Sequence, residues 1–137
     1  MNNRQPAPSV LAAEALQNLR DGNQRFVDAD RCIDTYLSHT QLDEHIEGQS
    51  PYAIVLGCSD SRVPVEMIFD VGLGDAFVIR VAGNIVAPSL IGSVELAAAK
   101  FGARLVVVLG HTGCGAISTT IDSMQSGDLG ESENIGS

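Results

Sequence analysis

Three short apolar runs occupy the middle of the chain, at residues 53–56, 76–79 and 105–109. Each is four to five residues long and partly β-branched, and each ends in glycine or polar residues, which is typical of strands. Their hydrophobicity is continuous rather than alternating, as in parallel strands that helices cover on both faces. We therefore predict three buried strands in a parallel sheet.

Helical spacing of apolar residues precedes the first run. Ser9 can cap a helix through the sequence LAAEAL, and Gly22 is placed to end it, with a short turn following over residues 24–27. The apolar positions that carry this pattern are Leu16, Leu19, Phe26 and Val27.

Further helices are expected around and after the later strands. Residues 92–103 predict a crossover helix that Ser93 caps and Gly102 stops, and residues 65–69 a short helix opened by Pro64. A last helix is expected beyond Ala116. The apolar face of the crossover helix would consist of Val94, Leu96, Ala97 and Phe101, and that of the last helix of Ile117, Ile121 and Met124.

These elements predict an α/β fold, with a central, mostly parallel β-sheet flanked by helices and an N-terminal helical arm. A length of 137 residues with 45% hydrophobic content suits one domain, residues 1–137. Within it, residues 1–50 form the arm and a polar connector, and residues 51–125 form the α/β core.

Charge and composition narrow the possible partners. The chain has 17 acidic and 8 basic side chains, and no Lys/Arg cluster that could follow a phosphate backbone, so we expect no nucleic-acid partner. No run approaches the ~20 apolar residues of a membrane span, and the N-terminus does not resemble a signal peptide, so no membrane partner and a cytoplasmic location are expected. Three cysteines, an odd number, argue against a disulfide framework and leave metal binding or catalysis open.

Two polar motifs follow the first and third predicted strands. The motif CSDSR, 58–62, comes after one, and HTGCG, 111–115, after the other, at the strand ends where open α/β sheets bind ligands. Together they offer Cys58, His111 and Cys114, a set of two thiols and one imidazole that zinc accepts. Three protein ligands leave a fourth position for water, as in catalytic zinc sites, and Arg62 could supply positive charge or hold Asp60 as an acceptor.

Each of these residues also has a simpler interpretation. Cys58 alone would most often be a small core residue, HTGCG alone could cradle a phosphate, and Asp60 with Arg62 could be a helix cap and a surface ion pair. Their joint occurrence at adjacent strand ends favours the metal site. Three other candidate ligands lie in the polar connector and are interpreted as ordinary surface or packing residues: Cys32, His39 and His45.

Several stretches together resemble the β-class carbonic anhydrases of bacteria. They are CSDSRVPVE from residue 58, RVAGN at 80–84, GSVELA at 92–97, GHTGCGA at 110–116 and, in the predicted arm, LRDGNQRFV at 19–27. The resemblance implies one Zn²⁺ per chain, held by Cys58, His111 and Cys114, beside a catalytic dyad of Asp60 and Arg62. Asp60 could also become a fourth ligand in a resting form.

The resemblance implies further contacts around the substrate. Gln49 would donate a hydrogen bond to bound CO₂ or bicarbonate, and the backbone N–H of Gly115 would face the anion. Apolar positions of the substrate site, often reached across a dimer interface, correspond to Val63, Phe77, Ala82 and Leu96. A homodimer or tetramer is expected.

The implied activity is that of a carbonate dehydratase: reversible hydration of CO₂ to bicarbonate and a proton, by attack of zinc-bound hydroxide. Two alternatives stay open, a hydrolase of carbonyl sulfide or carbon disulfide and an inactive zinc- or anion-binding fragment.

The chain departs from the family in two ways. It lacks the C-terminal part, so we expect a truncated domain whose last strand has an unpaired edge. Leu96 stands where the bicarbonate-inhibited subtype has tyrosine, although Val63 and Arg80 match, so no strong bicarbonate inhibition is expected.

Overall fold

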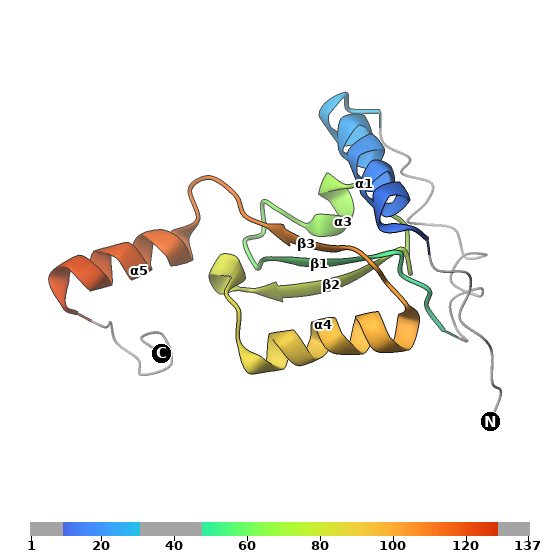
Figure 1. Ribbon diagram of the computed structural model, residues 1–137. Helices are drawn as coiled ribbons and strands as arrows, with labels where there is room; N and C mark the ends of the chain where they lie inside the picture. The colour runs from blue at the N-terminus through green and yellow to red at the C-terminus, as the bar shows by residue number, and fades with distance from the viewer. Residues whose placement is uncertain (1–9, 31–47, 129–137) are drawn as a thin grey trace.

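The fold is built on a parallel sheet of three strands. The computed structural model describes residues 10–30 and 48–128, so Cys32, His39 and His45 lie outside the described residues. The strands are β1 (Ala53–Cys58), β2 (Ala76–Val81) and β3 (Val106–Leu109), and they lie in the order β2-β1-β3 (Figure 1). All three predicted strands are confirmed, and both pairings are parallel. The division into an arm and a core at residue 50 stays a prediction.

Strand β1 is the centre of the sheet, and all six of its residues are buried. It runs two residues beyond the predicted run of 53–56, so Cys58 is the last residue of the strand rather than a residue that follows it. The register places Gly57 opposite Arg80 of β2 and Leu109 of β3. The carboxyl ends of all three strands therefore meet at one edge of the sheet.

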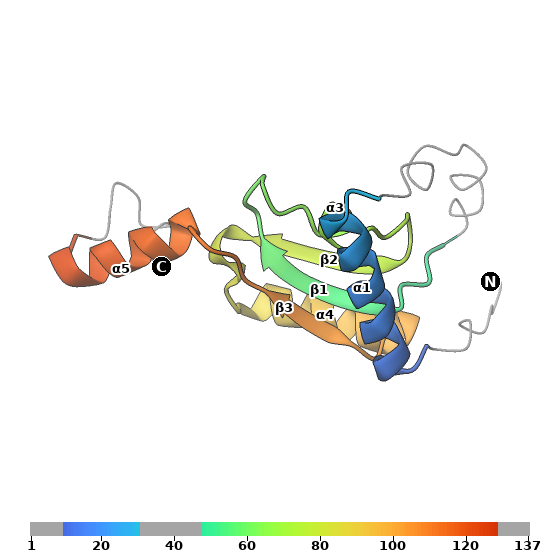
Figure 2. The same ribbon diagram turned by 90° about the horizontal axis from the view of Figure 1, so that it is seen from above.

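Helices cover both faces of the sheet, as predicted (Figure 2). The helix α4 (Pro88–Phe101) lies on one face, and α1 (Ala12–Val27) and α3 (Val65–Ile68) lie on the other. The α4 side has a core of Ile54, Leu56, Ile79, Ala97 and Ala103. The α1 side has a core of Leu19, Ala53 and Val71.

Helix α1 runs without interruption through Gly22, so the prediction of a helix end there, followed by a separate turn over 24–27, is wrong. Gly22 is buried against the segment after α3, and a Cβ at this position would lie 1.8 Å from the Phe69 carbonyl oxygen. The missing side chain of Gly22 therefore lets the backbone of α1 approach the backbone at Phe69, and it does not end the helix. The N-cap is Leu11, and the predicted cap, Ser9, lies outside the described residues.

Helix α4 begins at Pro88, four residues before the predicted range of 92–103. Pro88 occupies its first turn, where proline is tolerated, so Ser93 lies inside the helix and donates a hydrogen bond to the Ser89 carbonyl oxygen. The predicted stop at Gly102 is confirmed, with a left-handed φ of 73°. Pro64 precedes α3 as its N-cap, so it opens that helix as predicted, and the helix ends at Ile68, one residue before the predicted end.

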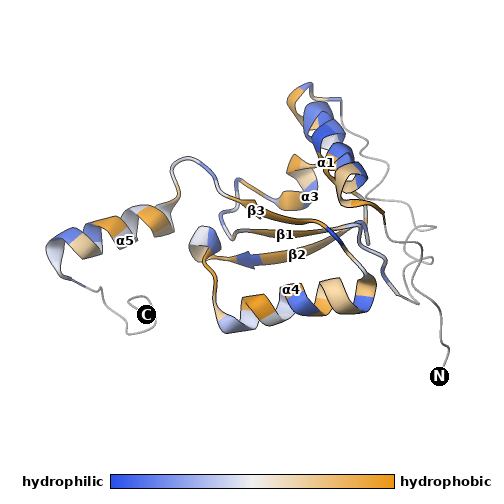
Figure 3. Ribbon diagram, viewed as in Figure 1, coloured by the Kyte–Doolittle hydropathy of each residue, from blue (hydrophilic) through white to orange (hydrophobic). Residues whose placement is uncertain are grey.

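Only β1 is buried along its whole length: β2 is mostly partly buried and β3 is half exposed, which corrects the prediction of three buried strands. Val106 and Val108 are 47% and 60% exposed. Strand β3 is one of the two edge strands, and the register pairs these valines with Ile54 and Leu56, which face α4, but no helix buries them there. The helix α5 (Gly115–Ser126) extends away from the sheet (Figure 1). It has no buried residue, so its apolar positions, which are visible in Figure 3, form an exposed surface rather than a packed face.

No helix among the described residues is both long enough and apolar enough to cross a membrane.

Candidate metal centre

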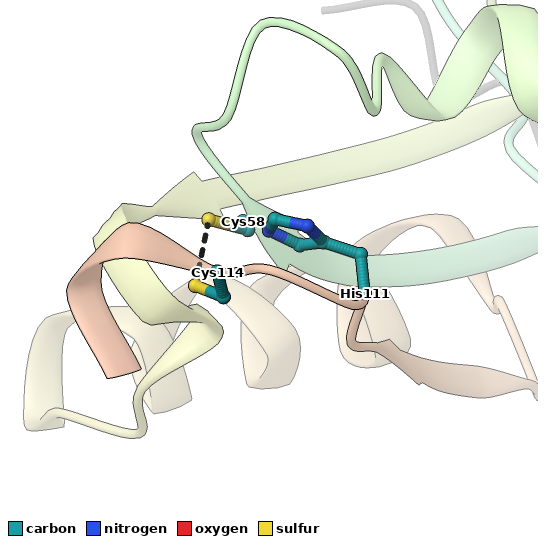
Figure 4. A group of neighbouring side chains, drawn as sticks. All are labelled: Cys58, His111 and Cys114. Carbon is teal, nitrogen blue, oxygen red and sulfur yellow. Dashed lines mark hydrogen bonds between the residues drawn. The ribbon is translucent and has the colours of Figure 1, made fainter. Parts of the chain in front are cut away.

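The candidate centre lies at the carboxyl ends of β1 and β3. Cys58 closes β1, and Cys114 is the N-cap of α5. His111 lies in the turn between β3 and α5. The parallel register carries both strand ends to the same edge, so residues 53 positions or more apart in sequence meet there (Figure 4).

The three side chains form a compact donor set. Their ligand atoms all lie within 4.8 Å of one another, and the two sulfur atoms are 3.8 Å apart. A tetrahedral zinc ion with Zn–S bonds of about 2.3 Å separates its two sulfur ligands by about 3.8 Å. The spacing of the thiols therefore fits zinc.

The imidazole of His111 is also arranged as a ligand. Its Nδ1 lies 3.1 Å from the Thr112 carbonyl oxygen, so the proton belongs on Nδ1 and the lone pair on Nε2. Nε2 is buried and has no hydrogen-bond partner in the part of the chain that the structure describes. A buried nitrogen that lacks a partner is costly, and a metal ion among these donors would satisfy it.

The Cys58 sulfur is stabilised as a thiolate by its surroundings. The neighbouring His111 side chain contributes most, and the backbone N–H groups of Asp60 and Gly83, each 3.4 Å from the sulfur, contribute further. Together they lower the pKa of Cys58 to about 6, whereas the interaction with Cys58 raises the pKa of His111. Gly83 has a φ of 75°, a conformation that favours glycine.

Asp60 and Arg62 form an ion pair directly beside the donor set. Arg62 donates three hydrogen bonds to the Asp60 carboxylate, from its backbone N–H, Nε and Nη2, at 2.9, 2.9 and 2.7 Å. The carboxylate lies 3.9 Å from His111 Nε2. These bonds hold the pKa of Asp60 well below its usual range, so the group is ionised at neutral pH.

Arg62 also connects the two halves of the centre. Its Nη2 donates a 3.0 Å hydrogen bond to the carbonyl oxygen of Gly113, in the turn that carries His111 and Cys114. The pair is thus more than the surface ion pair considered from the sequence.

The residues expected around the substrate are not all gathered at this edge. Ala82 directly follows β2, Gly115 opens α5, and Val63 donates a hydrogen bond to the Asp60 carbonyl oxygen, so these three lie next to the centre. Phe77 lies four residues before Val81 on β2, about 13 Å along the strand, and packs against Phe101.

Two other expected residues are placed differently. Gln49 is exposed and precedes the amino end of β1, whereas Cys58 closes the carboxyl end, so the strand separates them within one chain. Leu96 is 51% exposed on α4. The substrate roles of these residues stay predictions.

Sequence reasoning assigned no contact with the centre to two residues that have one, Gly83 and Arg80. Gly83 donates to the Cys58 sulfur, and Arg80 donates to carbonyl oxygens of the 58–60 backbone. Both belong to the stretch RVAGN, so the signal was present, but nothing in the sequence alone shows that the end of β2 lies beside Cys58.

Comparison with known proteins identifies the family. A family model described as carbonic anhydrase matches residues 53–136, more than half of the chain. The chain belongs to the carbonic anhydrase family. Carbonic anhydrase 2 of Mycobacterium tuberculosis is 40% identical over 122 residues, which cover 89% of this chain and 58% of that protein. The carbonic anhydrase of Mycolicibacterium smegmatis is 39% identical over 122 residues, 89% of this chain and 59% of that protein. The chain thus spans about three fifths of the length of these relatives.

Solved structures of β-carbonic anhydrases share the fold. The β-carbonic anhydrase CcaA has a TM-score of 0.60 at 32% identity, with 82% of this chain and 52% of that chain covered. A structure described among two tetrameric β-carbonic anhydrases of Sordaria macrospora has a TM-score of 0.57 at 28% identity, with 80% and 52% covered. The resemblance inferred from the motifs is confirmed.

Proposed function

We propose that Cys58, His111 and Cys114 hold one zinc ion and that this protein catalyses the reversible hydration of CO₂ to bicarbonate and a proton. One observation carries the proposal: two thiols and an imidazole nitrogen with no hydrogen-bond partner among residues 10–30 and 48–128 converge beside a carboxylate that an arginine holds in place. Membership of the carbonic anhydrase family supports it. When bound at such a site, zinc acidifies a coordinated water and so supplies a nucleophile near neutral pH.

Asp60 orients the nucleophile in this proposal. Because its carboxylate is ionised, it accepts a hydrogen bond and does not donate one, so it can fix the direction of an attacking O–H group. Arg62 keeps the carboxylate charged and in position. The guanidinium is exposed, so its positive charge also faces the direction from which bicarbonate would leave or enter.

The same contacts favour an arrangement in which Asp60 is not a metal ligand. Both carboxylate oxygens accept hydrogen bonds from Arg62, so a fourth-ligand role would require Asp60 to give up bonds to Arg62. We propose the Arg62-bound form as the active one and the metal-bound form as an alternative resting state.

A homodimer or tetramer is part of the proposal. The Sordaria macrospora structures are described as tetrameric, and this chain exposes the apolar side chains of α5 at Ile117, Ile121 and Met124. Gln49 lies at the opposite end of β1 from Cys58, and a neighbouring copy is one source from which a glutamine could reach the site.

The decisive experiment combines metal content with CO₂ hydration on the full chain. We expect one zinc per chain and hydration measured by stopped flow with a pH indicator. Cys114→Ser should lose both metal and activity, whereas Cys32→Ser, the matched removal of a thiol from the connector, should keep both. Asp60→Asn should keep zinc and lose turnover by about 100-fold.

Folded protein that binds no zinc would contradict the proposal, as would full activity of Asp60→Asn. Carbonyl sulfide and carbon disulfide are assayed in parallel. Faster turnover of either than of CO₂ would replace the proposed substrate and leave the zinc centre intact.

A further inference from the structure

A second arginine at the carboxyl edge of the sheet contacts the backbone of the candidate centre. Arg80 lies near the end of β2, opposite Gly57 of β1 in the register. Its Nε donates a 2.9 Å hydrogen bond to the Cys58 carbonyl oxygen, and its Nη2 donates a 2.7 Å bond to the Asp60 carbonyl oxygen. One planar guanidinium thus spans the first and third residues of CSDSR.

The segment that Arg80 spans contains both a candidate ligand and the dyad carboxylate. Between the two carbonyls, the Ser59 N–H donates to the Val81 carbonyl oxygen at 3.0 Å. Arg80 and Val81 of β2 therefore bind the backbone of residues 58–60 at three consecutive positions. The Asp60 N–H in turn points at the Cys58 sulfur, 3.4 Å away. That N–H belongs to the 59–60 peptide, and these bonds anchor the peptide on each side of it.

We propose that Arg80 is a positioning residue, which fixes the 58–60 backbone so that the Cys58 sulfur and the Asp60 carboxylate face the same metal position. The inference rests on the proposed function, because it assigns Arg80 a role toward the metal and the dyad. Arg80 touches neither the ligand atoms nor the carboxylate, and it acts through the main chain.

The two-point contact requires the shape of arginine as well as its charge. A lysine at position 80 would keep the positive charge but present a single ammonium group, which cannot reproduce the fixed fork of Nε and Nη2. Removal of a group that orients a metal ligand without touching the metal typically lowers metal affinity or activity by about 10–100-fold. We expect a loss in this range for Arg80→Gln and a smaller loss for Arg80→Lys.

The first measurement is amide hydrogen exchange on the metal-free chain of 137 residues. In Arg80→Gln the amides of Ser59 and Asp60 should exchange faster than in the parent chain. The matched control is Arg104→Gln, which removes the same charge from an exposed arginine just before β3, at the opposite end of the sheet. If these amides exchanged at the same rate in Arg80→Gln as in Arg104→Gln, Arg80 would not hold the 58–60 backbone.

The second measurement tests positioning rather than stability. Zinc affinity is determined by competition with a chelator, and Co²⁺ is substituted to record the thiolate-to-cobalt absorption band. Arg80→Gln should bind zinc about 10–100-fold more weakly and shift the band, Arg80→Lys should fall between, and Arg104→Gln should match the parent. Parent-like affinity and band in both Arg80 variants would overturn the proposal, even if their unfolding midpoints fell.

These outcomes separate the inference from the proposed function. A parent chain that binds zinc without hydrating CO₂ refutes the proposed activity, while the affinity series still decides the role of Arg80. A parent chain that binds no zinc refutes the centre itself and with it the positioning role, whatever the exchange data show. Should Arg80→Gln fail to fold, Arg80→Lys carries the test alone, because it keeps the charge and removes only the fork.

Discussion

The substitution Gly22→Ala should destabilise the fold although it improves the intrinsic helix propensity of α1. Alanine is favoured over glycine within a helix by about 1 kcal/mol. In this structure, however, a Cβ at residue 22 would lie 1.8 Å from the Phe69 carbonyl oxygen, where real Cβ contacts stay beyond 3.0 Å. Helix α1 and the segment after α3 must therefore separate by about 1.2 Å, the difference between these two distances.

That separation would disrupt the bonds that join the two segments. The Asn23 side chain donates to the Ile68 carbonyl oxygen at 3.0 Å, and Arg25 pairs with buried Asp70 at 2.6 Å. Forced overpacking costs about 1–3 kcal/mol, and one lost hydrogen bond about 1 kcal/mol. After the gain in helix propensity is subtracted, we expect a net loss of about 2 kcal/mol in the free energy of unfolding.

Urea unfolding followed by far-ultraviolet circular dichroism measures this loss, and the chain offers a matched control. Gly92 lies within α4, is exposed, and has nothing within 4 Å of an added Cβ. Gly92→Ala should therefore stabilise the protein by up to about 1 kcal/mol. The signs of the two effects should be opposite. If Gly22→Ala were as stable as the parent, the close approach of α1 to Phe69 would be refuted.

Three further predictions concern the core, the pH dependence and the metal. Val55→Thr in buried β1 should cost about 1–3 kcal/mol in urea unfolding, whereas Val108→Thr on exposed β3 should change stability by less than about 0.5 kcal/mol; equal costs would contradict the half-buried edge strand. Burial, with Asp75 adding to it, raises the pKa of Tyr52 to about 12, so its contribution to stability is intact below its ordinary value of 10.0 and is lost as the pH rises toward 12. Tyrosinate absorbance is followed against pH in Tyr36→Phe, where Tyr52 is the one remaining tyrosine. A Tyr52 pKa near its ordinary value of 10.0 would refute the prediction. Removal of metal from zinc-loaded protein by a chelator should speed amide exchange in residues 111–126 more than in β1, because α5 has no buried residue to hold it; uniform protection before and after would refute this.

The sheet and the donor set were predictable because they depend on short patterns. Continuous apolar runs marked the three strands, and polar motifs directly after two of them marked the edge where Cys58, His111 and Cys114 converge. Parallel strands bring their carboxyl ends together whatever the details of packing. The prediction therefore required only the strand directions and not the positions of individual side chains.

The features that failed depend on what lies opposite a residue. The sequence around Gly22 reads as a helix stop, and only the Phe69 carbonyl oxygen on another segment explains why the helix continues. The apolar run of β3 predicts buried valines, but their burial depends on whether a helix covers that part of the sheet. The contacts of Arg80 likewise required knowledge that β2 pairs with β1 in this register.

The candidate centre has two halves, residues 58–62 and residues 111–114. The contacts between the halves couple the position of the ligand-bearing turn to that of the Asp60 carboxylate. Strand β1 supplies a rigid, buried base for Cys58, whereas His111 and Cys114 lie on a turn whose helix, α5, packs only lightly against the rest of the chain. Within the described residues, side-chain contacts across the gap include the 3.8 Å approach of the two sulfurs, the Arg62 bond to Gly113, and the packing of Ala116 and Ile117 near Gly83. His111 adds its contact with Cys58 and lies 3.9 Å from the Asp60 carboxylate. Arg62 thus holds the Asp60 carboxylate and the ligand-bearing turn with the same guanidinium, so a displacement of the turn would also disturb the carboxylate. A metal ion bound by all three donors would close this gap directly, and its binding energy would then contribute to the stability of the folded edge.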